Sequence, residues 1–179
     1  MTKHVALLRG INVGGHGLVA MSDLRAMLAE LGMGECKTLL QSGNVVLDSP
    51  KLTGEKLERR LERETARRLG VACDYLVRTE KEWRTIIANN PFPAAAKSDP
   101  SHLLVMCLKA APGPAAVEEI AAALQGGEQI RGVRRELYLV YPAGIAKSKL
   151  SGALIERKLN SRGTARNWNT VLKLAAMLE

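Results

Sequence analysis

Apolar positions in the first half of the chain fall into short continuous runs and helical repeats. The runs His4–Arg9 and Ala72–Arg78 predict buried strands. Leucines and methionines spaced at i, i+3, i+4 and i+7 predict a helix that Gly32 ends, and a charged helix is expected over Thr53–Gly70. Two β-prone runs around Ser42-Gly43 predict a hairpin between these helices. The order β-α-β-β-α-β is that of a ferredoxin-like unit.

The second half has a similar order of patterns, although no repeat is visible residue by residue. The apolar run His102–Leu108 predicts a strand, and the helical repeat after Pro114 predicts a helix. A hairpin is expected about Arg134-Arg135, followed by helical segments at Leu150–Leu159 and Thr164–Leu178. The last segment stands where a closing strand would complete the unit. This half is therefore interpreted as a degenerate duplicate of the first.

The predicted fold class is α+β, with two ferredoxin-like (βαββαβ-type) subdomains, the second degenerate and ending in a C-terminal helix. The stretch from Asn90 to Pro100 is rich in proline and cannot continue a helix or a strand. The first subdomain is expected over residues 1–89, including a short connecting helix that Thr79 and Glu82 begin as a capping box. Residues 90–179 would form the second, and the two are expected to pack as one compact unit.

The charge of the chain is concentrated near its C-terminus. Ten basic residues lie in one segment: Arg131, Arg134, Arg135, Lys147, Lys149, Arg157, Lys158, Arg162, Arg166 and Lys173. Only Glu136 and Glu156 oppose them, so this segment carries the whole net charge of +8. A positive surface that carboxylates do not neutralise attracts anions, and phosphates are the commonest cellular anions. The segment therefore predicts a partner that bears phosphate groups.

Other features narrow the class of protein. No apolar run approaches the about 20 residues that span a bilayer, and the apolar stretch before Arg9 is too short for a signal peptide. Cys36, Cys73 and Cys107 are expected to be small buried residues in a reducing cytoplasm. Because the histidines show no ligand spacing with cysteines or acidic residues, no metal is expected. No cofactor and no membrane contact are expected either.

The first candidate site is the glycine-rich loop that follows Arg9. Glycines let backbone N–H groups point at a ligand, and a loop that enters a helix suits an anion. Arg9, Asn12, Gly14 and Gly15 are the candidate anion-binding residues here. The alternative is a loop that needs glycine only for its backbone conformation.

The second candidate site is the turn of the first predicted hairpin. Gln41, Ser42 and Asn44 could place polar groups in a cleft. No nucleophile elbow surrounds Ser42, and Ser-Gly-Asn is also an ordinary tight-turn sequence. The turn interpretation is favoured.

The third candidate site is the segment Thr164–Thr170. Thr164 as a helix N-cap would put Arg166 in the first helical turn, where a cation opposes the helix dipole and calls for a negative partner. That partner could be a protein carboxylate, or a phosphate or carboxylate ligand to which Asn167 and Asn169 add hydrogen bonds.

Lys147, Ser148 and Lys149 precede another predicted helix and extend the same candidate site. Tyr138 and Tyr141 lie among the basic residues, but their odd spacing directs them to opposite strand faces. At most one of them could stack on a base.

Three sequence motifs also carry a resemblance to a known family. They are Leu8-Arg9-Gly10-Ile11-Asn12-Val13-Gly14-Gly15, Gln41-Ser42-Gly43-Asn44-Val45 and Thr164-Ala165-Arg166-Asn167-Trp168-Asn169-Thr170. Together they resemble the bacterial family called domain of unknown function 1697, over nearly the whole chain. The resemblance implies two ferredoxin-like subdomains and no established activity. The chain departs from the family after Gly15, since Gly17 and Leu18 stand where members commonly have Asn-Lys.

Three functions remain open from the sequence. The leading hypothesis is a cytoplasmic binding protein whose basic C-terminal half engages a phosphate-bearing partner, with nucleic acid favoured. The alternative is an enzyme acting on a small phosphorylated or carboxylated metabolite in a cleft between the subdomains, although no general base can be named. The third is a structural or protein-interaction module. The sequence does not indicate the oligomeric state.

Overall fold

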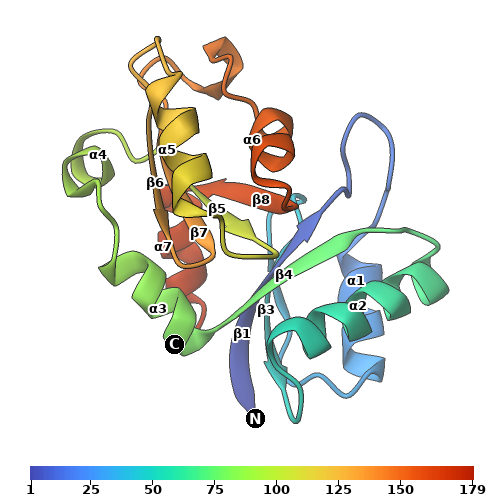
Figure 1. The fold of residues 1–179 in the computed structure, drawn as a ribbon. Coiled ribbons are helices and arrows are strands. Elements are labelled where there is room, and N and C mark those ends of the chain that lie inside the picture. The colour runs from blue at the N-terminus through green and yellow to red at the C-terminus, as the bar shows by residue number, and fades with distance from the viewer. The chain divides into compact units, whose positions relative to one another are not determined.

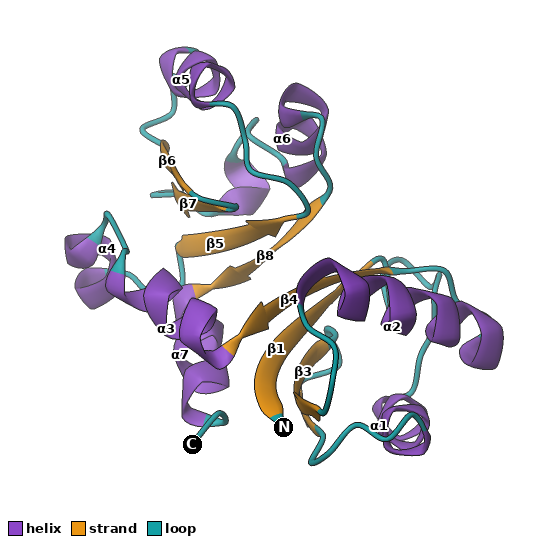
Figure 2. Cartoon of the chain, turned by 60° about the horizontal axis from the view of Figure 1, so that its bottom comes forward, coloured by secondary structure: helices purple, strands orange, loops and turns teal.

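The computed structural model describes residues 1–179 and contains two four-stranded antiparallel sheets with helices between their strands (Figures 1 and 2). The chain divides into two compact units. Unit 1 comprises Met1–Thr85 and Leu174–Glu179, and unit 2 comprises Ile86–Lys173. The prediction of an α+β protein with two ferredoxin-like subdomains is confirmed. No helix combines the length and the apolar character needed to cross a membrane.

Unit 1 follows the element order predicted for the first half. Its elements are β1 (Thr2–Arg9), α1 (Met21–Glu30), β2 (Lys37–Leu39), β3 (Asn44–Ser49), α2 (Gly54–Leu69) and β4 (Asp74–Thr79), followed by α3 (Glu80–Ala88). The strands lie in the order β2-β3-β1-β4. Alternate strand residues such as Leu8, Val45 and Val77 pack against Leu28 and Leu61 of the two helices. The helices therefore cover one face of this sheet (Figure 2).

Local signals account for the helix boundaries of unit 1. Thr79 and Glu82 form the predicted capping box, since the Glu82 carboxylate accepts from the Thr79 N–H at 2.8 Å and the Thr79 hydroxyl accepts from the Glu82 N–H at 3.2 Å. Helix α2 ends at Gly70, which adopts the left-handed conformation with φ 68°.

Unit 2 repeats the topology of unit 1. Its elements are α4 (Pro93–Ser98), β5 (Leu103–Leu108), α5 (Pro114–Ala122), β6 (Gln129–Val133), β7 (Glu136–Val140), the 3-10 turn η1 (Ile145–Lys147), α6 (Gly152–Leu159), β8 (Gly163–Asn167) and α7 (Trp168–Ala176). The strand order β6-β7-β5-β8 matches that of the first sheet position by position. A core that includes Met106, Ile120, Leu139 and Ile155 fills the space between this sheet and helices α5 and α6.

The prediction that a helix begins at Thr164 is wrong for residues 164–167, which belong to a strand. Residues Gly163–Asn167 form strand β8, which pairs antiparallel with β5 so that Arg166 lies opposite Val105. Helix α7 starts at Trp168, and the Asn167 side chain caps it by accepting from the Thr170 N–H at 3.0 Å. Backbone N–H and C=O groups of these residues form hydrogen bonds with β5 instead of the hydrogen bonds of a first helical turn. Unit 2 therefore has the closing strand that the sequence pattern had not revealed.

Candidate anion-binding site

The glycine-rich loop of unit 1 is a small hairpin. Val13 and His16 exchange two backbone hydrogen bonds of 3.2 and 2.9 Å around Gly14 and Gly15. Both glycines have positive φ, 56° and 77°, as a tight two-residue turn requires. The need for this backbone conformation is sufficient to explain both glycines.

Asn12 ties this loop to the β2–β3 turn. Its amide nitrogen donates to the carbonyl of Gln41 at 2.9 Å and to that of Val19 at 3.1 Å, and its oxygen accepts from the Val19 N–H. Buried Asn44 donates to the Leu39 carbonyl and to the Ser42 hydroxyl, at 3.0 and 2.9 Å. The first two sequence motifs therefore meet at one end of the first sheet, where these side chains hold two loops together.

Arg9 lies beside a carboxylate of its own unit. Its guanidinium is 3.1 Å from Asp74, the residue opposite it in the β1–β4 pairing. The Asp74 side chain is only 11% exposed. The positive charge of Arg9, for which the sequence had suggested an anionic ligand, is therefore balanced by Asp74 across the strands.

Arg166 lies on the face of the second sheet opposite helices α5 and α6. Its neighbour Ala165 packs against the core under those helices, and strand side chains alternate between faces. The guanidinium donates to the Thr164 hydroxyl at 2.7 Å and to the Ala165 carbonyl at 2.8 Å. Burial lowers the pKa of Arg166 to about 10, so it stays charged at neutral pH. Asn169 is exposed in the first turn of α7.

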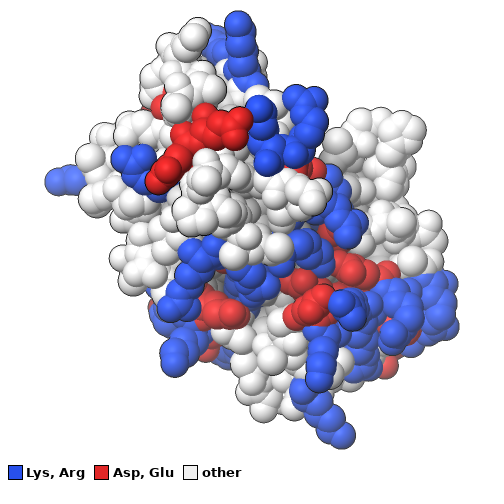
Figure 3. Space-filling view, viewed as in Figure 1, with Lys and Arg blue, Asp and Glu red and all other residues white.

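The open basic region of unit 2 surrounds α6. We define the α6 basic surface by residues on and beside this helix: Lys147, Lys149, Arg157, Lys158 and Arg162. The side chains of Lys147, Lys149 and Arg157 form no hydrogen bond or ion pair. The acidic residue of the helix, Glu156, turns its carboxylate to the N–H of Gly163 at 3.2 Å. Figure 3 shows basic side chains gathered over α6 and acidic ones over neighbouring α5.

Ser148 fixes the segment that carries two of these lysines. Its hydroxyl donates to Glu128 at 2.6 Å and accepts from the Leu150 N–H at 3.1 Å. The hydrogen bond from Ser148 is the main cause that lowers the pKa of Glu128. The Tyr141 hydroxyl adds a 2.8 Å hydrogen bond to the Leu150 carbonyl. Lys147 and Lys149 therefore extend from an anchored backbone.

A cavity of 380 Å³ adjoins this segment between α5 and α6. Its apolar lining comes from both helices and their flanks, and consists of Ile120, Ala123, Leu124, Leu150 and Leu154. Lys147, Lys149 and Lys158 also line it, together with Glu119 and Glu128. The Lys158 ammonium lies 3.7 Å from Glu119, whereas Lys147 and Lys149 form no ion pair, so three lysines and two carboxylates leave the lining with one net positive charge.

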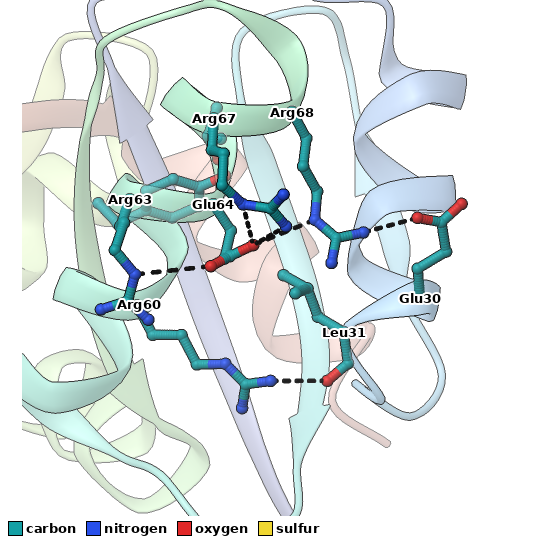
Figure 4. Close-up of polar contacts among 9 residues, drawn as sticks. Glu30, Leu31, Arg60, Arg63, Glu64, Arg67 and Arg68 are labelled. Atoms are coloured by element: carbon teal, nitrogen blue, oxygen red, sulfur yellow. Dashed lines mark hydrogen bonds and ion pairs between the residues drawn. The ribbon is translucent and has the colours of Figure 1, made fainter.

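The arginines of α2 in unit 1 differ because each has a polar partner within the unit. Glu64 accepts hydrogen bonds from Arg67 and Arg68 and lies 3.5 Å from Arg63 (Figure 4). These contacts, with the hydrogen bond from Arg67 the largest, lower the pKa of Glu64 to about 2. Arg60 donates to the carbonyl of the residue that follows α1. The arginines of α2 are thus engaged within unit 1.

Sequence reasoning did not single out Arg157, Lys158, Arg162 or the cavity as parts of a site. A signal was present, since Lys147 and Lys149 flank one end of a short predicted helix and Arg157 and Lys158 end it. The two tyrosines among the charges are both 1% exposed, and Tyr138 donates to the Ile86 carbonyl at 2.7 Å. Neither can stack on a base. No group of three or more His, Cys, Asp or Glu residues gathers in metal-binding geometry.

These features define an α+β protein of two ferredoxin-like units, the second of which presents an open basic surface. The chain belongs to the family described as "Protein of unknown function (DUF1697)", whose model matches residues 1–138. The matched range ends before Lys147, so the α6 basic surface lies beyond it.

One solved structure is similar over almost the whole chain. It is described as "The structure of conserved bacterial protein SP0830 from Streptococcus pneumoniae", with 22% sequence identity, a TM-score of 0.75 and coverage of 99% of each chain. At this identity the likeness shows the fold alone, and it extends to the C-terminal part that the family model does not match. No curated protein matches the chain in sequence.

Proposed function

We propose that this protein binds a phosphate-bearing partner, with nucleic acid favoured, through the α6 basic surface in the cytoplasm. The observation that carries the proposal is that three cations of this surface, Lys147, Lys149 and Arg157, have no carboxylate partner. Their side chains form no hydrogen bond or ion pair within the protein. Cations in this state are free to replace the counterions of a phosphate backbone.

The contrast with the other candidates supports this choice of surface. Arg9 is paired with Asp74, and three arginines of α2, at positions 63, 67 and 68, contact Glu64. Arg166 lies on the opposite face of the second sheet from α6 and is engaged by Thr164 and the backbone. A ligand that meets Lys147 and Lys149 on the helix side therefore does not meet Arg166 at the same point. The phosphate contacts are assigned to the α6 basic surface rather than to the C-terminal motif.

The partner is expected to be held by its backbone rather than by its base sequence. Both tyrosines of the segment are buried, so the surface offers charge without a stacking platform. Lysine ammonium groups act on phosphate as point charges and carry no base information. Binding should therefore be similar for different sequences and should depend strongly on salt.

The test is fluorescence anisotropy of labelled single-stranded and duplex RNA and DNA with the full chain, at low and at moderate salt. A triple variant, Lys147→Gln, Lys149→Gln and Arg157→Gln, is expected to weaken binding for every sequence alike. The matched control is Lys51→Gln, Lys81→Gln and Lys97→Gln, which removes the same charge from exposed positions outside α6. Equal loss in both triples would show that only net charge matters and would contradict the assigned surface.

A further inference from the structure

The cavity between α5 and α6 combines an apolar lining with two lysines that form no ion pair. Its volume of 380 Å³ lies within the range of small-molecule sites, roughly 300–1,000 Å³. Leucines 124, 150 and 154 supply much of the lining, and Lys147 and Lys149 stand beside it. We propose that this cavity binds a small organic anion with an apolar body, such as a medium-length acyl or alkyl chain that ends in a carboxylate or phosphate.

The charges around the cavity favour an anion over a neutral or cationic ligand. Of the two carboxylates in the lining, Glu119 lies 3.7 Å from Lys158, and Glu128 accepts from the Ser148 hydroxyl at 2.6 Å. Lys147 and Lys149 have no such partner. An anionic head group would gain two charge-assisted contacts there without displacing an existing ion pair.

The apolar lining favours a ligand with a chain or ring over a bare phosphate. Leu124 and Leu154 pack on the core of unit 2 but keep part of their surface accessible at the cavity. Covering this surface removes apolar area from water, which free phosphate cannot do. The occupant is therefore distinct from the polymer proposed for the outer part of the α6 basic surface.

The backbone around Lys149 is fixed in advance of binding. Ser148 is held by Glu128, and the carbonyl of Leu150 is held by the Tyr141 hydroxyl, whose pKa burial raises to about 12. A lysine on an anchored backbone loses less conformational freedom on binding than one on a mobile loop. The two hydrogen bonds explain why a serine and a buried tyrosine accompany the lysines.

The test is isothermal titration calorimetry of the full chain with sodium octanoate, octyl phosphate and octanol, combined with amide chemical-shift mapping of the octanoate complex. Octanoate or octyl phosphate is expected to bind about tenfold or more tightly than octanol, since only the charged head groups form charge-assisted hydrogen bonds with the lysines. The comparison of octanoate with octyl phosphate identifies the preferred head group. Shift changes are expected at Leu124, Lys149 and Leu154.

Two variants locate the site. Lys147→Gln with Lys149→Gln should reduce the affinity for octanoate to that for octanol, whereas Lys97→Gln with Lys173→Gln should leave it unchanged. Ala123→Trp, at an exposed position of the lining, should block all three ligands by filling the cavity. Equal affinity for octanoate and octanol, shift changes elsewhere, or no binding at millimolar concentration would each overturn the proposal.

This inference can fail independently of the proposed function. Ala123→Trp leaves the charges of the α6 basic surface in place and should not change nucleic-acid binding. Arg157→Gln removes a cation that does not line the cavity and should not change octanoate binding. Octanoate binding without nucleic-acid binding, or the reverse, would retain one proposal and discard the other.

Discussion

The carboxylate of Glu58 accepts a hydrogen bond from the backbone N–H of Val77 at 2.8 Å, which protects part of the free edge of β4. Glu62, one helical turn later, accepts from the Tyr75 N–H at 2.9 Å. An edge strand otherwise presents unpaired N–H groups that can pair with another chain. Because these two carboxylates point inward, half of the acidic residues of α2 do not offset its basic outer face.

Glu58→Ala is expected to lower the free energy of unfolding by about 3 kcal/mol, measured by urea denaturation. The side chain is 1% exposed and lies 3.9 Å from Arg78, so its removal leaves a buried N–H and a buried guanidinium less well satisfied. Glu58→Gln keeps an acceptor for the Val77 N–H but removes the charge beside Arg78, so it should cost less than Glu58→Ala, about 2 kcal/mol. Equal effects of the two changes would show that the hydrogen bond to Val77 is unimportant.

Asn12 should prove to be a structural residue. Asn12→Ala removes the three contacts to Val19 and Gln41 and is expected to destabilise the fold by about 2 kcal/mol. Nucleic-acid affinity should stay unchanged at a temperature where the variant is folded. If Asn12→Ala weakened nucleic-acid binding without changing thermal unfolding, the prediction would be wrong and the glycine-rich loop would be part of the ligand site.

The fold was predictable where its signals are local. Thr79 and Glu82 lie three residues apart, and their capping box could be identified without knowing any tertiary contact. The contact of Asn12 with Gln41 spans 29 positions and could not be inferred from either motif alone. Strand β8 was missed for the same reason, since its partner β5 begins 60 residues earlier and Thr164 is an acceptable helix cap in isolation.

The candidate site was predictable in its charge but not in its geometry. The excess of basic residues is a property of composition, and it pointed to the half of the chain that contains the α6 basic surface. Which cations are free depends on the partners that folding gives them, as the contrast between Arg9 and Lys149 shows. The cavity beside Lys149 required helices α5 and α6 to be placed against one sheet.

Asn167→Ala should destabilise the protein by about 1 kcal/mol, because Asn167 caps α7 through the Thr170 N–H. Asn167→Ser should retain most of the stability. Thr164→Ala is the control, because the sequence had suggested Thr164 as the N-cap. This variant should leave the capping of α7 intact. Amide exchange at Thr170 is the readout, with faster exchange expected for Asn167→Ala alone.

His4 should make stability decrease as the pH falls below the ordinary histidine pKa of 6.5. The side chain is fully buried between the Thr2 carbonyl at 2.7 Å and the Thr53 hydroxyl at 3.1 Å, and burial lowers its pKa below the ordinary value of 6.5. Below pH 6.5 the unfolded chain therefore binds a proton that the folded chain does not. The contribution of His4 to the free energy of unfolding should be fully present above pH 6.5 and should decrease as the pH falls below it.

His4→Gln removes this titration, so the difference in unfolding free energy between pH 7.5 and pH 5.5 should shrink in the variant. Urea denaturation at the two pH values provides the measurement. An unchanged difference would mean that His4 does not titrate differently in the folded and unfolded chains.

The most direct test of the central claim is the salt dependence of nucleic-acid binding by the wild-type chain and by the Lys147→Gln, Lys149→Gln, Arg157→Gln variant. If these three side chains each neutralise one phosphate of a single strand, the slope of log affinity against log salt should become shallower by about 2. The control triple at Lys51, Lys81 and Lys97 should keep the wild-type slope. No binding at low salt, or the same slope in all three proteins, would contradict the assignment of the α6 basic surface as a phosphate-binding surface.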